Sequence, residues 1–77
     1  MTPKQCKMAR AGLGWTVSDL SKKSGSRAAT ISNFERGGDA LKSTVEALKD
    51  ALLSSGEIRF EGETGVFIII DEAHKAN

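Results

Sequence analysis

Residues 16–37, TVSDLSKKSGSRAATISNFERG, decide the fold that we expect for this chain. Leu20 supplies an apolar position of a first short helix, and Gly25 ends that helix because glycine tolerates the left-handed backbone of a tight turn. Ile31 and Phe34 lie three residues apart, the spacing of neighbours on one face of a second helix. The segment therefore predicts two short helices joined at Gly25, which is a helix-turn-helix.

A further helix is predicted before this segment. Thr2 is a suitable N-cap, Pro3 lies at the first helical position and Gln5 can return the capping bond. An apolar stripe at helical spacing follows, and a glycine-rich stretch ends the helix. Trp15 comes next, and its size makes it the expected lid over the core, while Thr16 caps the following helix. The stripe consists of Cys6, Ala9 and Leu13.

Beyond this segment the pattern predicts one more helix and a β-hairpin. Residues 43–53 carry Val45, Leu48 and Leu52 at helical spacing. The period then changes to alternation, a turn follows, and residues 66–70 are rich in β-branched side chains. We therefore predict a mainly α chain: a helical domain at residues 1–55, a C-terminal β-hairpin at residues 56–72 and a flexible tail at residues 73–77.

Length and composition indicate one small globular domain. The chain has 77 residues, of which 39% are hydrophobic and 27% charged. The longest apolar run, residues 66–70, is far shorter than the roughly 20 residues of a membrane span. The first 15 residues lack the apolar segment of a signal peptide, and the single cysteine, Cys6, cannot form an internal disulfide. We therefore expect a cytoplasmic protein.

The net charge of +1 conceals an uneven distribution of charge. Residues 1–36 contain seven Lys and Arg against two acidic residues, whereas residues 37–77 contain four against eight. A basic half is expected where a protein faces phosphates, with an acidic half toward protein or solvent. A chance distribution of charge over a globular surface is the alternative.

Several residues of the helical region occur together in one known family. They are Leu20, Gly25, Ala29-Thr30-Ile31-Ser32, Phe34-Glu35-Arg36-Gly37, Val45, Leu48 and Leu52. With them, residues 5–52 resemble the Cro/C1-type, or Xre-like, helix-turn-helix regulators of bacteria and phages. The resemblance implies a lambda-repressor-like four-helix domain whose second paired helix, residues 27–36, enters the major groove of DNA.

Two positions depart from the family pattern. Val17 stands where a phosphate-contacting glutamine is common, so that contact would have to come from backbone N–H groups at the helix start. Ser26 stands where the turn residue is usually apolar; it weakens the packing of the turn but could cap the next helix.

The outward side of residues 27–36 supplies the predicted DNA contacts. Small residues suit contact with thymine methyl groups, hydroxyl and amide groups can bond base edges, and arginines can reach guanine or phosphate. The candidates are Arg27, Ala28, Ala29, Thr30, Ser32, Asn33 and Arg36. Ala29 could equally pack inward, and Arg36 could reach phosphate alone. The phosphate candidates, each with a solvated surface position as its alternative, are Lys22, Lys23, Lys42, Ser43 and Thr44.

Arg10 and Glu35 occupy positions at which family members often pair the first and third helices. The resemblance implies a partly buried ion pair that orients the third helix. Cys6 fits a small buried residue, with a redox sensor as the alternative. One Cys and one His, His74, cannot supply a nucleophile, a base and an orienting group, so we expect no enzyme, metal site or cofactor.

The apolar run at residues 66–70 exceeds what one face of a two-stranded hairpin can bury. Either the helices cover one face and a partner the other, or the strand pairs edge to edge with its copy, as in some Cro proteins. The third alternative is that the run fills the core of the monomer. The residues assigned to a dimer interface are Ile58, Phe60, Val66, Phe67, Ile68, Ile69 and Ile70.

The sequence therefore predicts a dimeric repressor with double-stranded DNA and a second copy of itself as partners, and with no membrane or small-molecule ligand. A two-fold dimer would place two recognition helices about one DNA turn apart on a palindromic operator. Control of its own operon is an implication of the resemblance. The competing hypothesis is an antitoxin or antiactivator-type protein-interaction module on the same fold, which Val17 and the modest charge favour.

Overall fold

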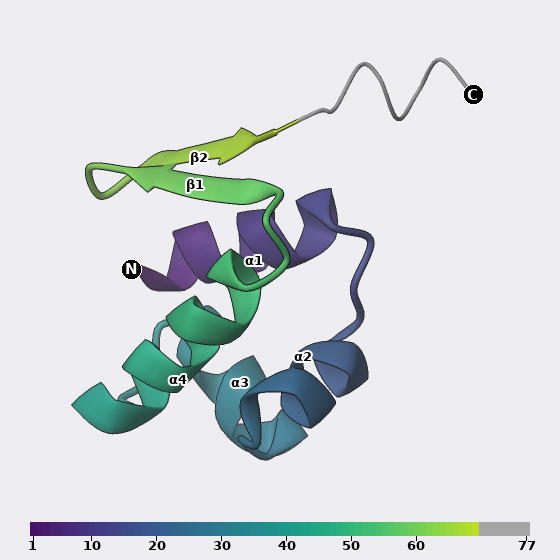
Figure 1. The fold of residues 1–77 in the computed structure, drawn as a ribbon. Helices are drawn as coiled ribbons and strands as arrows, with labels where there is room; N and C mark the ends of the chain where they lie inside the picture. The colour runs from purple at the N-terminus through teal and green to yellow at the C-terminus, as the bar shows by residue number, and fades with distance from the viewer. Residues whose placement is uncertain (70–77) are drawn as a thin grey trace.

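The computed structural model describes residues 1–69, which form four helices and a two-stranded antiparallel hairpin (Figure 1). The hairpin lies on one side of α1, and α2, α3 and α4 lie on the other. The mainly helical fold class is confirmed; the end of the predicted hairpin, residues 70–72 with Ile70, and the predicted tail lie outside the described residues. The elements are α1 (Pro3–Gly12), α2 (Val17–Ser24), α3 (Ala28–Glu35), α4 (Lys42–Leu53), β1 (Ile58–Glu61) and β2 (Gly65–Ile68).

The first two helices begin with complete capping boxes. Thr2 and Gln5 exchange side-chain and backbone bonds at the start of α1, as predicted, and Thr16 and Asp19 do the same at the start of α2. Gly25 follows α2 with φ of 78°, which confirms the left-handed turn residue.

The start of α3 differs from the prediction that Ser26 could cap it. Arg27 occupies the N-cap position, and among residues 1–69 no side chain caps this helix. The Ser26 carbonyl instead accepts a hydrogen bond of 2.6 Å from the Ser21 hydroxyl, so Ser26 is used within the turn. Arg27 and Arg36 therefore flank α3 rather than belong to it.

The core lies between all four helices and the hairpin. Burying a large aliphatic side chain, such as a leucine or isoleucine, stabilises a fold by about 1.5–3 kcal/mol. Val45 and Trp15 pack against the core while remaining partly exposed, which fits the predicted lid role of Trp15. The buried apolar residues are Cys6, Ala9, Leu20, Ile31, Phe34, Leu48, Ala51, Leu52 and Ile58.

One face of the hairpin packs against the helices. Ile58 pairs with Ile68 and Phe60 with Val66, and directly opposed residues share a face of a sheet. This inner face lies toward the helices: Ile58 is 4% exposed, and Phe60 and Val66 pack on the core. The assignment of Ile58 to a dimer interface is therefore corrected, because its side chain is already buried within the monomer.

An ion pair joins α1 to α3. Arg10 Nε donates to Glu35 Oε2 at 2.9 Å and Arg10 Nη2 to Glu35 Oε1 at 2.8 Å, a two-pronged geometry. Arg10 Nη1 also donates to the Trp15 carbonyl at 3.0 Å, which fixes the connection between α1 and α2. The two charged side chains are only 16% and 7% exposed, so the pair is partly buried as expected.

We predict that Glu35→Ala lowers the free energy of unfolding by on the order of 3 kcal/mol, because it leaves the partly buried Arg10 charge without its carboxylate partner. DNA affinity should fall with it, since α3 loses its tether to α1. Denaturant unfolding and DNA titration of the same preparations would measure both. The double variant Arg10→Met/Glu35→Leu is the control and should lose less stability than the single variant. An unchanged melting temperature for Glu35→Ala would contradict a structural role for the pair.

Candidate nucleic-acid interface

The buried residues of α3 determine which of its residues face outward. Ile31 and Phe34 lie in the core, so the opposite side of the helix presents Ala29, Ser32 and Asn33. Ala29 is exposed, which decides against its packing inward, and Ala28 is exposed as well. Thr30 and Ser32 are half-buried. The surface that α3 offers is therefore narrow and made of small side chains.

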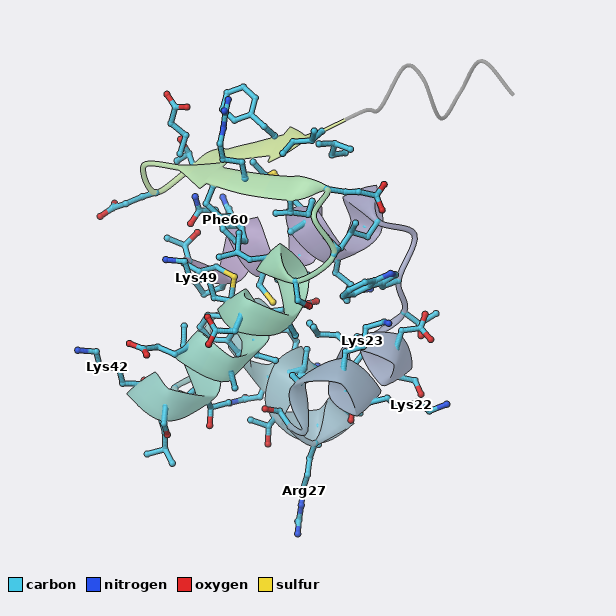
Figure 2. The ribbon with its side chains drawn as sticks, in the orientation of Figure 1. Lys22, Lys23, Arg27, Lys42, Lys49 and Phe60 are labelled. Carbon is cyan, nitrogen blue, oxygen red and sulfur yellow. The ribbon has the colours of Figure 1, made fainter. Side chains whose placement is uncertain are left out.

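Three basic side chains surround this surface. Figure 2 shows Arg27 pointing away from the protein at the start of α3, with Lys42 and Lys22 on either side at the same end of the molecule. All three are exposed. The hairpin lies at the opposite end, so a ligand bound at this basic end would leave β2 accessible.

The starts of α3 and α4 leave backbone N–H groups available. Arg27 and Leu41 are the N-cap residues, and within residues 1–69 neither helix receives a side-chain capping bond. Uncapped helix starts carry partial positive charge and suit phosphate oxygens. Lys42 and Ser43 are exposed at the start of α4, as a phosphate contact requires.

The start of α2 is less suited to phosphate. The Asp19 N–H donates to the Thr16 hydroxyl at 3.0 Å, and the Asp19 carboxylate accepts from the Thr16 N–H at 2.9 Å. These bonds from Thr16 lower the pKa of Asp19, so a negative charge is fixed at this helix start. The backbone N–H groups at the start of α2 are therefore poor substitutes for the phosphate contact that a glutamine commonly makes in this family at the position of Val17.

Two predicted contact residues have partners within the protein. Lys23 Nζ lies 4.8 Å from the centre of the Trp15 ring, a cation–π contact, so Lys23 covers the lid over the core. Asn33 Nδ2 donates to the Asp39 carbonyl at 3.2 Å, and the Gly38 N–H donates to the Asn33 carbonyl at 2.8 Å. Asn33 thus orders the loop from α3 to α4 with one of its two amide N–H groups, and the second N–H and the side-chain oxygen remain for a base.

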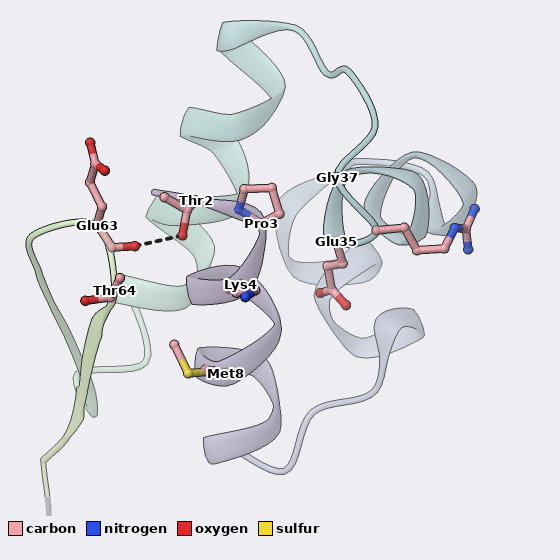
Figure 3. A pocket seen from close by; sticks show the side chains of 9 residues that line it. Thr2, Pro3, Lys4, Met8, Glu35, Gly37, Glu63 and Thr64 are labelled. Carbon is pink, nitrogen blue, oxygen red and sulfur yellow. Dashed lines mark hydrogen bonds between the residues drawn. The ribbon is translucent and has the colours of Figure 1, made fainter.

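Arg36 lies at the far end of α3 and lines an open pocket of about 470 Å³ (Figure 3). The pocket lies between the start of α1, the end of α3 and the hairpin turn. Glu35 also lines it, but its carboxylate is bound to Arg10. Among the described residues no buried polar side-chain atom lacks a hydrogen-bond partner.

Leu41 is a residue that the sequence reasoning did not single out. Its side chain is 74% exposed, beside Lys42 at the start of α4. An apolar side chain in this position could contact a deoxyribose or a thymine methyl group. The sequence contains little indication of this role, because a single leucine between a loop and a helix is usually interpreted as a core residue.

Cys6 is enclosed at the ion pair. It is fully buried, and its Sγ donates to Glu35 Oε2 at 3.5 Å. Burial, reinforced by the Glu35 carboxylate, raises the pKa of the Cys6 thiol to about 12. The thiol is thus protonated and inaccessible, which favours the structural alternative over a redox sensor.

Comparison with protein families identifies the domain. A helix-turn-helix family model matches residues 7–52, more than half of the chain. The chain belongs to the Cro/C1-type helix-turn-helix family. It is accordingly a DNA-binding helix-turn-helix regulator, and α2 and α3 are the paired helices of this family's motif.

A search of curated proteins finds none that matches this member of the family. No helix within residues 1–69 has the length and apolar character needed to cross a bilayer. The same residues contain no group of three or more His, Cys, Asp or Glu side chains arranged to hold a metal ion.

We predict that native Cys6 resists thiol reagents at pH 8. With a pKa of about 12, its thiolate fraction is on the order of 10³-fold below that of an unfolded cysteine. Alkylation followed by mass spectrometry should show modification only after the protein is unfolded in guanidinium. Modification of the native protein at the rate of the unfolded control would restore the sensor alternative.

Proposed function

We propose that this protein is a dimeric transcriptional repressor that binds a palindromic operator and occludes a promoter, acting in the cytoplasm. The observation that carries the proposal is the exposed start of α3, which no side chain of residues 1–69 caps, with Arg27 at its tip and Lys22 and Lys42 on either side. Control of its own operon is part of the proposal.

Affinity and specificity would come from different parts of this surface. Lysine and arginine side chains contribute phosphate contacts that hold the protein on any DNA sequence. Ala28, Ala29 and Ser32 are small and make few contacts with base edges. One copy would discriminate weakly between sequences, and two copies bound together would discriminate better.

The hairpin supports a second copy as the partner. Phe67, Ile68 and Ile69 are 45%, 49% and 48% exposed. The Ile69 N–H bonds the Glu57 carbonyl at 2.7 Å, and hydrogen-bonded pairs alternate along an antiparallel ladder. The backbone groups of Val66 and Ile68 therefore point away from β1, toward the open edge of β2. Such an edge can add a strand from another chain.

The alternative function is a protein-interaction module of the antitoxin or antiactivator type. It is favoured by the fixed charge of Asp19 at the start of α2, where the family commonly has a phosphate contact, and by the same exposed strand. Binding of DNA that weakens steeply with salt separates the two functions.

We predict that Arg27→Ala and Lys42→Ala each weaken DNA binding and reduce the slope of log K against log salt by about 1, the value for one lost phosphate contact. Fluorescence anisotropy at several salt concentrations would measure the slope, on DNA selected from a random pool. Lys49→Ala is the matched control, because Lys49 lies on α4 toward the hairpin and away from the basic end. No salt-dependent binding by the wild type would refute the repressor proposal.

We predict that Phe67→Glu abolishes the dimer while the monomer stays folded. Phe67 lies directly opposite Arg59, whose guanidinium is 4.9 Å from the ring, so a glutamate there gains a cross-strand ion pair. Two such charges at a symmetric interface would repel each other. Analytical ultracentrifugation should give a dimer mass for the wild type and for Lys49→Ala, which changes the net charge equally, and a monomer mass for Phe67→Glu. A wild-type monomer at micromolar concentration would contradict the dimer.

A further inference from the structure

We propose that Gln5 is a positioning residue that locks the hairpin onto α1 and thereby sets the distance between the two recognition helices of the dimer. The proposal rests on the DNA-binding dimer put forward above. It assigns this residue an effect on operator spacing, in addition to its part in capping α1.

Gln5 connects three separate places in the chain. Its side chain is 1% exposed, and its Nε2 donates to the carbonyls of Gly62 at 2.9 Å and Gly65 at 3.0 Å. Its Oε1 accepts from the Thr2 N–H at 3.0 Å. One side-chain amide thus accepts a hydrogen bond at the start of α1 and donates hydrogen bonds to both sides of the hairpin turn. The Thr2 hydroxyl adds a third bond to the turn, to the Glu63 carbonyl at 3.0 Å.

A second anchor holds the other end of the hairpin. A Cβ atom added to Gly12 would meet the Ile68 side chain at 2.6 Å, so β2 approaches α1 closely at this point. From Gln5 to Gly12 a helix rises roughly 10 Å, and from Gly65 to Ile68 a strand also rises roughly 10 Å. The distance between the two anchors is therefore similar along α1 and along β2. Contact at two points fixes the direction of the strand relative to α1, whereas contact at one point would let the strand rotate.

The same helix transmits this orientation to the DNA-binding surface. Arg10 lies on α1 between the two anchors and holds Glu35 at the end of α3 through two hydrogen bonds. The strand, α1 and α3 are thus joined in series by the Gln5 bonds, the close approach of Ile68 to Gly12 and the ion pair. If β2 meets its copy across a two-fold axis, the separation of the two α3 helices follows from these joints.

Substitution of Gln5 by glutamate separates its two roles. A glutamate can still accept the Thr2 N–H, because glutamate serves this position of a capping box as well as glutamine. Its carboxylate cannot donate to the Gly62 and Gly65 carbonyls and would repel them. Gln5→Glu should therefore keep the start of α1 and release the turn. Gln5→Ala, which adds no charge, is the second variant.

The test measures affinity for pairs of identical half-sites whose centre-to-centre spacing is varied one base pair at a time. The half-site is obtained by selection from random DNA with the wild-type protein. We expect one sharp optimum for the wild type, and for both Gln5 variants a broader or displaced optimum with affinity at the wild-type spacing lowered about tenfold. Affinity for a single half-site should stay within about twofold, because α3 is untouched.

Leu48→Val is the control for a loss of stability alone, since Leu48 is buried in the helical core. It should scale the affinity at every spacing equally and leave the shape of the profile unchanged. All proteins are compared at a temperature at which circular dichroism shows native helix content. Wild-type spacing profiles in Gln5→Glu and Gln5→Ala would overturn the role of Gln5 and leave the repressor proposal standing. A wild type that gains nothing from a second half-site would overturn the dimer and this inference together.

Discussion

The bonds from Arg10 to Glu35 and to the Trp15 carbonyl are the interaction on which the arrangement of the helices depends. The α3 helix has eight residues and, within the described chain, no side-chain cap. A helix this short is unstable alone, so its stability must come from tertiary contacts. Ile31 and Phe34 hold it by packing, which is not directional, whereas the two-pronged ion pair fixes its rotation relative to α1.

The distribution of helix caps follows a division of roles. The helices that build the frame, α1 and α2, begin with complete capping boxes, and those at the basic end, α3 and α4, begin without side-chain bonds from residues 1–69. A cap stabilises a helix by about 1 kcal/mol but occupies the N–H groups that would otherwise meet a phosphate. Leaving these helices uncapped keeps those groups available, at a cost that the ion pair and the core offset.

Local features of the chain could be predicted from the sequence, and contacts between distant residues could not. The capping box of Thr2 and Gln5, the turn at Gly25 and the buried face of Ile31 and Phe34 depend on neighbours within a few positions, which a pattern records. The bonds from Gln5 to the hairpin turn span 57 and 60 residues, and no local pattern encodes them. The basic character of residues 1–36 was predictable because charge is read directly from the sequence.

The orientation of individual side chains in the candidate site was not predictable in the same way. Lys23 carries the expected charge, but its ammonium group lies over the Trp15 ring in a cation–π contact. Asn33 has the right chemistry for a base edge, but one of its two amide N–H groups donates to the Asp39 carbonyl in the loop after α3.

The five-residue apolar run shows how one sequence feature can serve several surfaces. Alternation places Val66 toward the helices and Phe67 and Ile69 on the outer face, while the backbone of Val66 and Ile68 faces the open edge. Pairing through the edge and packing through the face are therefore not competing uses of the same atoms. In a sheet continued through the β2 edge, the outer faces of the two copies adjoin, so Phe67 and Ile69 of both copies would form one apolar surface.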